Sequence, residues 1–342
     1  MSADPTSLAA LVAAVPAPIA ARLAGARAVL AVGHENPDAD ALGAAIALAR
    51  IVTARGGRAT VASSEPLAAL YDFLPGAADV RTDPDPTLPY DLVVLCDCSD
   101  VARAGAIVER HPDLFARTPI LVLDHHASSD GSGELGWVDQ DAAATCELVA
   151  LIALRLGVGL DEGEGRLATA LMVGLVMDTA TFAHPNTTPR TLRLAAALLE
   201  AGAPLAEISR RLYRTKPEAQ LRLFGRVLGR LETHDEGRVV VSTLELADLA
   251  DCGALPEHSE GLVDLLVQAE AAEVAVLLKE GEESTRLSVR TKQGGVDATA
   301  LAAAWGGGGH ARAAGATIAL PLAAAREAVL PAAVALARGV RR

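Results

Sequence analysis

Basic and aromatic residues are both scarce in this 342-residue sequence. It has 30 Lys and Arg against 43 Asp and Glu, which gives a formal net charge of −13. Because a protein that follows long nucleic acids carries a broad basic surface, any nucleic-acid partner is expected to be short. Aromatic residues make up only 3%, and the 51% of hydrophobic residues are mostly Ala, Leu and Val. This composition suits helices packed on a sheet.

Paired cysteines, a targeting signal and long apolar runs are also missing. The four cysteines form no CxxC pair, and no basic region precedes the mildly apolar N-terminal stretch. Charges or turn residues interrupt the alanine-rich runs well before the roughly 18 positions that a bilayer span needs. The sequence therefore predicts a cytoplasmic protein with reduced thiols and no membrane partner.

Short runs rich in Val, Leu and Ile alternate with helical patterns in the first half of the chain. Strands separated by helix-length segments indicate βαβ units and a parallel sheet, so the predicted fold class is α/β. The first crossover helix is expected at 41–57, ended by two glycines. The predicted strands are 26–33, 58–64, 91–97 and 119–124, and later helices are expected at 145–156, 164–178 and 188–201.

The length predicts more than one domain, since single cores usually stop growing before this size. We predict a larger domain at 1–203, a charged helical connector at 204–232 that Pro217 breaks in two, and a smaller α/β domain at 233–342. In the smaller domain we expect strands at 238–246, 273–280 and 284–292 and helices near 258–269, 297–305 and 322–338.

Residues that bind metals follow three of the predicted strands. Ligands of open α/β sheets bind outside the carboxyl ends of the strands, so side chains at these positions are expected to meet. They are His34, Asp38 and Asp40 after the first strand, Asp97 at the end of the third, and Asp124, His125 and His126 after the fourth; Asp178 in GLVMDTATF is a further candidate.

Each of these residues has another interpretation when it is taken alone. Asp38 and Asp40 could cap the next helix, either histidine could be satisfied in the core, and Asp178 could be a solvent-facing cap. Together, however, so many acids at one sheet edge would repel one another and lose hydration unless cations neutralised them. The combination predicts a metal site.

The types of ligand indicate which metal binds. Carboxylates and imidazoles without thiolate suit Mn²⁺, with Mg²⁺, Co²⁺ or Fe²⁺ as substitutes, more than a structural Zn²⁺. Six candidates are too many for one ion, and two ions roughly 3.5–4 Å apart that share a carboxylate activate water and hold a phosphoryl group. Cys96 and Cys98 flank Asp97; we expect both to be buried and to point away from it.

A second group of candidates lies in WGGGGHARAAG, residues 305–315. Consecutive glycines let backbone amides approach an anion closely, although such a run is more often a flexible loop. His310 and Arg312 add donors, and Arg290 and Lys292 lie in the nearby SVRTKQGG. We interpret the segment as a phosphate or nucleotide cradle.

These motifs together resemble the DHH phosphoesterase superfamily, named for the triplet that is Asp124-His125-His126 here. HENPDADALG, CDCSD, LDHHAS and GLVMDTATF resemble its four N-terminal motifs, and GGGGHARAAG resembles the DHH-associated domain that closes over the substrate. The length and lack of added domains are similar to the group of bifunctional oligoribonucleases and 3′,5′-bisphosphate nucleotide (pAp) phosphatases, also called nanoRNases. Some members also cleave cyclic dinucleotides or their linear products.

The resemblance implies a role for each candidate residue. One Mn²⁺ would bind His34, Asp38 and Asp97, and a second would bind Asp40, Asp97, His125 and Asp178, so that Asp97 bridges the two. His126 would contact the scissile phosphate or assist the leaving oxygen, and Asp124 would orient the histidines. The substrate would be held in a cleft between the domains by Arg290, Gly307, Gly308, Gly309, His310 and Arg312.

The leading hypothesis is hydrolysis of short oligoribonucleotides to nucleoside 5′-monophosphates, with pAp and cyclic-dinucleotide products as further substrates. A pyrophosphatase or polyphosphatase, a RecJ-like exonuclease and a nucleotide-binding regulator without turnover remain alternatives. The glycine-rich histidine motif disfavours the first alternative, and the acidic charge disfavours the exonuclease. The resemblance also implies a homodimer.

Overall fold

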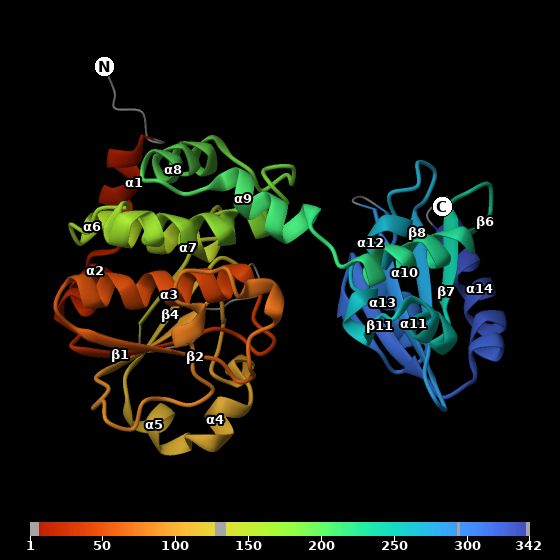
Figure 1. The fold of residues 1–342 in the computed structure, drawn as a ribbon, viewed down its shortest axis with the longest axis horizontal. Coiled ribbons are helices and arrows are strands. Elements are labelled where there is room, and N and C mark those ends of the chain that lie inside the picture. Colours follow the sequence, from red (N-terminus) through yellow and green to blue (C-terminus); the bar gives the residue numbers. More distant parts are fainter. Residues whose placement is uncertain (1–6, 127–134, 293–294, 340–342) are drawn as a thin grey trace. The chain divides into compact units, whose positions relative to one another are not determined.

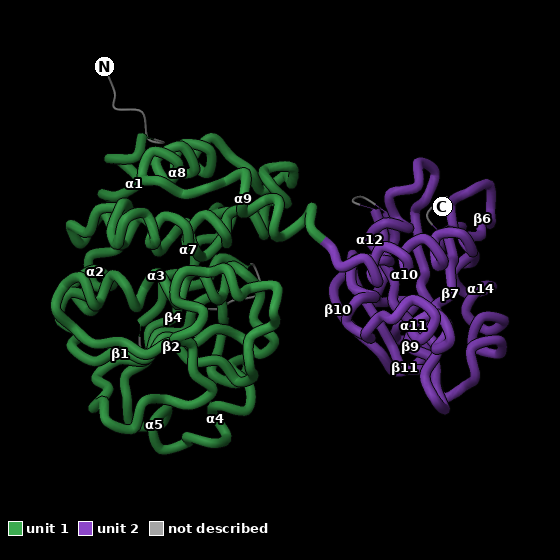
Figure 2. The backbone as a smooth tube through the Cα atoms, in the orientation of Figure 1, with its two compact units in different colours: residues 1–215 green, residues 216–342 purple. Residues whose placement is uncertain are grey.

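The computed structural model describes residues 7–126, 135–292 and 295–339. Residues 127 and 128 of the LDHHAS motif and residues 293 and 294 of SVRTKQGG lie outside this range. The chain forms two compact units, Met1–Thr215 and Lys216–Arg342 (Figure 2), and the boundary falls inside the predicted 204–232 connector.

Unit 1 is built on a parallel sheet of order β2-β1-β3-β4-β5. The strands are β1 (Ala28–Val32), β2 (Arg58–Ala62), β3 (Leu92–Cys96), β4 (Ile120–Asp124) and β5 (Leu135–Val138). The first four confirm the strands predicted from apolar runs. The sequence analysis missed β5, because this short edge strand, LGWV, is only partly buried and contains no β-branched apolar run.

Helices cover both faces of this sheet. Figure 1 shows α3, α6 and α7 layered on one face and α4 and α5 on the other. The helices are α1 (Leu8–Ala14), α2 (Ala17–Gly25), α3 (Ala39–Ala54), α4 (Ala106–Arg110), α5 (Pro112–Arg117), α6 (Thr145–Arg155), α7 (Glu162–Asp178), α8 (Pro189–Glu200) and α9 (Leu205–Ser209), followed by a π-helical turn at Arg210–Arg214. Among the described residues, no single helix is long and apolar enough to cross a bilayer, and only α1 and α2 together, bent by 77°, reach that length and composition.

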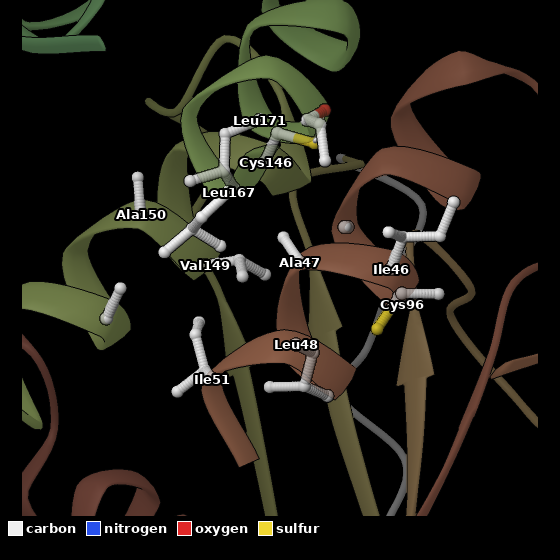
Figure 3. Close-up of a cluster of buried hydrophobic side chains, with 14 of the residues drawn as sticks. Ile46, Ala47, Leu48, Ile51, Cys96, Cys146, Val149, Ala150, Leu167 and Leu171 are labelled. Carbon is white, nitrogen blue, oxygen red and sulfur yellow. Dashed lines mark hydrogen bonds between the residues drawn. The ribbon is translucent and has the colours of Figure 1, made fainter. Parts of the chain in front are cut away.

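The core of unit 1 lies where α3 packs against α6 and α7. Ile46, Leu48 and Ile51 of α3 and Val149 and Leu171 of the two other helices are buried side by side (Figure 3). Twelve of the residues in α3 are buried, which explains why its sequence is almost uniformly apolar.

Gly43 of α3 lies close to the backbone of α7. A Cβ built there would overlap the carbonyl oxygen of Ala170 and lie 3.1 Å from Cys146 Sγ. We expect Gly43→Ala to destabilise unit 1 by about 1–3 kcal/mol, because the helices would have to separate. Thermal denaturation followed by circular dichroism would measure this effect. Gly225→Ala is the control, since no atom lies within 4 Å of its Cβ; equal melting temperatures for the two variants would contradict the prediction.

Unit 2 contains a mixed sheet of order β10-β11-β9-β8-β7-β6, in which only β7 and β8 are parallel. Its strands are β6 (Glu232–His234), β7 (Val239–Leu244), β8 (Val274–Glu280), β9 (Thr285–Thr291), β10 (Gly308–His310) and β11 (Ala313–Ile318). Its helices are α10 (Glu218–Gly229), α11 (Leu246–Cys252), α12 (Leu262–Leu266), α13 (Ala298–Ala303) and α14 (Leu322–Gly339). One core packs α13 and α14 on the sheet and a second packs α10, α11 and α12.

One prediction for this region needs correction. The helix expected near 258–269 is only α12, because residues 256–259 form a 3₁₀ turn and Gly261 adopts a left-handed φ of 80°. The glycine-rich segment, for which no strand was predicted, contributes to a hairpin of β10 and β11, which pairs Gly308 with Gly315. The predicted break at Pro217 is confirmed, since α10 begins directly after this residue.

Candidate metal centre

The carboxyl ends of β1, β3 and β4 bring the predicted metal ligands of unit 1 together. His34 follows β1, Asp38 and Asp40 begin α3, Asp97 follows β3, and Asp178 ends α7. Three groups have ligand atoms within 4.8 Å of one another: His34, Asp38 and Asp97; Asp40, His125 and Asp178; and Asp97, His125 and His126.

Asp97 lies at the centre of this cluster. Its side chain is almost fully buried, its Oδ2 is 3.6 Å from His34 Nε2, and its Oδ1 is 3.5 Å from His125 Nε2. Burial, followed by the charge of Asp38, raises the pKa of Asp97 to about 6. The residue has a left-handed φ of 56°, which Asp tolerates better than most residues.

This backbone conformation corrects the expectation for the neighbouring thiols. Cys96 and Cys98 are fully buried as predicted, but they lie in core clusters on opposite faces of the sheet. The strand alternation that would have placed them on one face ends at Asp97.

Asp40 is held by the N-terminus of α6. It is fully buried, its Oδ2 accepts the backbone N–H of Thr145 at 2.6 Å, and its Oδ1 accepts that of Cys146 at 2.9 Å. Burial, then the charges of Asp178 and Asp97, raise its pKa well above the usual value. The two amides fix the carboxylate where repulsion from its neighbours would otherwise turn it away.

His125 presents one nitrogen to three carboxylates. Its Nδ1 lies 3.3 Å from the carbonyl oxygen of Ala142, which favours a proton on Nδ1 and leaves Nε2 facing the cluster. Nε2 lies 3.0 Å from Asp178 Oδ2 and 4.0 Å from Asp40 Oδ2. Burial opposes a charge on the ring, but Asp178, Asp40 and Asp97 outweigh it and raise the pKa to about 10.

The donor set fits a divalent cation. Buried carboxylates with raised pKa values and an imidazole nitrogen aimed at them form a site that attracts positive charge. The described ligand atoms are oxygen and nitrogen, the types preferred by Mn²⁺ and Mg²⁺. Asp38 belongs to one of the three groups and also caps α3, because its Oδ1 accepts the N–H groups of Asp40 and Ala41.

Asp124 holds the backbone of His125 and His126 and the ring of His126 in place. It is fully buried, and its Oδ1 accepts the backbone N–H groups of His125 and His126 at 2.8 and 3.2 Å and lies 2.8 Å from His126 Nδ1. The hydrogen bond to Asp124 raises the pKa of His126, whose side chain is 40% exposed. His126 therefore lies at the accessible edge of the cluster.

In unit 2, β11 joins two of the predicted substrate-binding residues. Ala313 pairs with His310 of β10 and with Arg290 of β9, which places them in one row across three strands. Arg290 Nε is 2.6 Å from Asp264 Oδ1. Gly308, Gly309 and His310 are exposed, and Gly307 is partly buried.

Arg312 has a structural role that the sequence analysis did not identify. Its Nη1 donates to the carbonyl oxygens of Lys292 and Val296 at 2.6 and 3.1 Å. Arg312 therefore fixes the chain on both sides of residues 293–294.

The chain matches known protein families. Residues 28–175 match the DHH family, N-terminal domain, and residues 236–339 match the DHHA1 domain. The bifunctional oligoribonuclease and PAP phosphatase NrnA of Thermus thermophilus is 35% identical over 301 residues, 87% of this chain and 87% of that protein. The chain belongs to the DHH family.

More distant relatives agree with this assignment. The protein of the same name from Bacillus subtilis is 27% identical to this DHH protein over 288 residues, 83% of this chain and 87% of the relative. The fold matches that of an exopolyphosphatase-related protein from Bacteroides fragilis with a TM-score of 0.82, at 21% identity and 96% coverage of both chains. Our DHH protein is thus a metal-dependent hydrolase that acts on phosphoester bonds.

The sequence analysis missed several groups that hold the DHH cluster in place. Thr145 Oγ1 donates to Asp97 Oδ1 at 3.0 Å, and Asn186 Nδ2 donates to the carbonyl oxygens of Ala143 and Asp178 at 3.1 and 3.2 Å. Gly174 leaves room for Asp40, because a Cβ there would overlap Asp40 Oδ1. Single Thr, Asn and Gly residues form no recognisable motif in the sequence, so only the fold identifies these groups.

Proposed function

We propose that this DHH enzyme hydrolyses oligoribonucleotides of about two to five residues to nucleoside 5′-monophosphates. We further propose that it removes the 3′-phosphate of pAp and cleaves the linear dinucleotides that are produced from cyclic dinucleotides. The observation that carries the proposal is the cluster around Asp97 in a chain 35% identical, over 87% of its length, to the Thermus oligoribonuclease and PAP phosphatase. We place the reaction in the cytoplasm.

Two metal ions are proposed for the cluster. His34, Asp38 and Asp97 would hold one, and Asp40, Asp97, His125 and Asp178 would hold the other, with Mn²⁺ preferred and Mg²⁺ or Co²⁺ as substitutes. The spacing within 4.8 Å of the atoms in the first triad, and in Asp40, His125 and Asp178, supports this division. When bound, such ions polarise the phosphoryl group and lower the pKa of water to give a nucleophile.

The chain's own residues would position the substrate and move a proton. His126 Nδ1 is tied to Asp124, so Nε2 is the ring nitrogen left for the substrate. Because Asp124 raises the pKa of His126, the ring can carry a proton on Nε2 and donate it to the departing 3′-oxygen. Asp97, buried and bonded to Thr145, keeps its carboxylate fixed during this step.

We propose that unit 2 binds the nucleotide part of the substrate. In this assignment residues 1–203 catalyse, residues 233–342 bind the substrate, and residues 204–232 act as the hinge, in a homodimer. Arg290, Gly307, Gly308, Gly309 and His310 would contact phosphate or base. Arg312 would act there mainly by shaping the loop before α13, because its Nη1 already donates to two backbone carbonyls.

A panel of substrates tests the proposed function. The purified protein with Mn²⁺ should release mononucleotides from diribonucleotides and phosphate from pAp, and should leave pyrophosphate and polyphosphate largely intact. Preferred release of phosphate from pyrophosphate would instead support the pyrophosphatase alternative. Nucleotide binding without turnover on any member of the panel would support the regulator.

His310→Ala should weaken substrate capture and leave metal binding unchanged. We expect KM for diribonucleotides and pAp to rise by about tenfold, since one hydrogen bond to a charged phosphate is lost. Steady-state kinetics and Mn²⁺ titration by calorimetry would measure the two effects. His258→Ala is the matched control, because that histidine caps the 3₁₀ turn Pro256–Ser259 of the same unit. A loss of Mn²⁺ affinity in His310→Ala would contradict the assignment to substrate binding.

A further inference from the structure

Residues 139–146, here called the orienting segment, contact candidate metal ligands through hydrogen bonds. Within it, the carbonyl of Ala142 faces His125 Nδ1, and Thr145 donates through its backbone to Asp40 and through its hydroxyl to Asp97. The carbonyl of Ala143 shares the amide of Asn186 with the carbonyl of Asp178. The position of this one segment thus affects four of the six candidate ligands.

Two ion pairs of Arg190, with Glu147 and with Asp139 and here called the clasp, hold the orienting segment in place. Glu147 of α6 forms an ion pair with Arg190 of α8, and its Oε2 accepts the backbone N–H of Ala143 at 3.1 Å. Arg190 Nη1 also pairs with Asp139 Oδ2 at 2.7 Å, at the start of the segment. Glu147 is fully buried and the Arg190 side chain is 15% exposed. Arg190 therefore ties both ends of the segment together through two carboxylates.

Such a buried ion pair is a poor way to gain stability. Removing two charges from water costs several kcal/mol, and apolar residues of similar size often stabilise a fold equally well. What an apolar pair could not supply is the directed hydrogen bond from Ala143 to Glu147 and the bridge that Arg190 makes between two carboxylates, through Nε to Glu147 and through Nη1 to Asp139. The clasp is therefore better explained by the geometry that it imposes.

We propose that Arg190 is a positioning residue of the metal centre. It acts through Glu147 and Asp139 on the orienting segment, which sets the direction of His125 Nε2 and of the Asp40 and Asp97 carboxylates. The inference rests on the metal assignment proposed above. It predicts that Arg190 determines metal affinity although it belongs to none of the candidate ligand groups described for the cluster.

The test is Mn²⁺ binding to the full-length protein without substrate, measured by calorimetry. Arg190→Met should weaken Mn²⁺ affinity by about 10- to 100-fold, the range typical for residues that orient ligands. Arg190→Lys keeps the charge but has a single nitrogen in place of the two that pair with Glu147 and Asp139, so it should give an intermediate affinity. Saturating Mn²⁺ should restore most of kcat, because Arg190 orients ligands rather than touching the substrate.

Arg50→Met is the matched control. Arg50 Nε pairs with Glu162 Oε2 at 2.8 Å, and the two side chains are 20% and 26% exposed, so this pair is also partly shielded, although less than Arg190 and Glu147. Glu162 lies at the start of α7 and Asp178 at its end, so this ion pair lies at the other end of the helix from the metal-binding candidates. Arg50→Met should lower the melting temperature and leave Mn²⁺ affinity unchanged.

The double variant Arg190→Met with Glu147→Leu removes both charges and keeps the test valid if the single variant does not fold. It should be folded, because the fully buried Glu147 charge is removed together with Arg190 and the Asp139 side chain, which loses its partner, is 21% exposed to water. Its Mn²⁺ affinity should remain low. Wild-type affinity in the double variant or in a folded Arg190→Met protein would overturn the inference, as would an equal loss of affinity in Arg50→Met. A wild-type protein that binds no Mn²⁺ would instead refute the metal assignment itself.

Discussion

Asp97→Ala should lower kcat/KM for diribonucleotides by about a thousandfold or more, because the carboxylate proposed to bridge two ions is lost. The fold should survive. Burial raises the pKa of Asp97 to about 6, so above that pH its charge opposes folding of the metal-free protein. The substitution also leaves the apolar cores intact. Initial rates with Mn²⁺, together with circular dichroism of the same samples, measure both effects.

Asp91→Ala is the matched control for this experiment. Asp91 precedes β3, and its carboxylate accepts the N–H groups of Arg27 and Ala28 at 2.8 and 3.2 Å, at the opposite end of the sheet from the cluster. This variant should lose stability and keep its hydrolytic rate. If Asp97→Ala retained more than about a tenth of the wild-type rate, the bridging assignment would be wrong.

Catalytic efficiency should fall steeply as the RNA substrate becomes longer. A net charge of −13 disfavours an extended basic track, so we expect the favourable contacts mainly from the few donors near Arg290 and His310 and from the metal centre. Each further nucleotide brings another negative charge toward an acidic protein. We expect kcat/KM to be highest for about two to five nucleotides and at least about tenfold lower for a 24-nucleotide strand.

Initial rates on 5′-labelled RNAs of several lengths between 2 and 24 nucleotides, with Mn²⁺ and at fixed salt, measure this dependence. Salt is held constant because screening alone changes the affinity for longer strands. The product should be nucleoside 5′-monophosphate at every length that is cleaved. Equal rates on the shortest and the longest strands, or processive degradation of the longest, would favour the RecJ-like alternative.

The strand-end residues could be predicted from sequence because two regularities coincide there. Apolar runs mark β1, β3 and β4, and the parallel arrangement makes their carboxyl ends converge, so His34, Asp97 and His125 were expected to meet. The division of labour between His125 and His126 came only from family resemblance. The structure gives a physical basis for it, since Ala142 and Asp124 bond to different rings.

Other features depend on backbone geometry that residue types do not encode. The cysteines beside Asp97 separate to opposite faces because of one left-handed φ, which no alternation rule anticipates. The pairing of Gly308 and Gly309 with β11 was not predicted, because a run of glycines carries no strand pattern. The orienting segment was missed because its contacts to Asp40 come from amides that every residue possesses.

The glycines at the contact of α3 and α7 limit how this enzyme can be engineered. Replacing helical glycine by alanine is a common route to heat resistance, because it restricts the unfolded chain. At Gly174 the added methyl group would meet Asp40 and Cys146, so a gain in rigidity would displace a candidate metal ligand. Alanine at Gly225 in α10 meets no such obstacle. A thermostable variant would therefore be sought by substitutions in α10, with the glycines between α3 and α7 left unchanged.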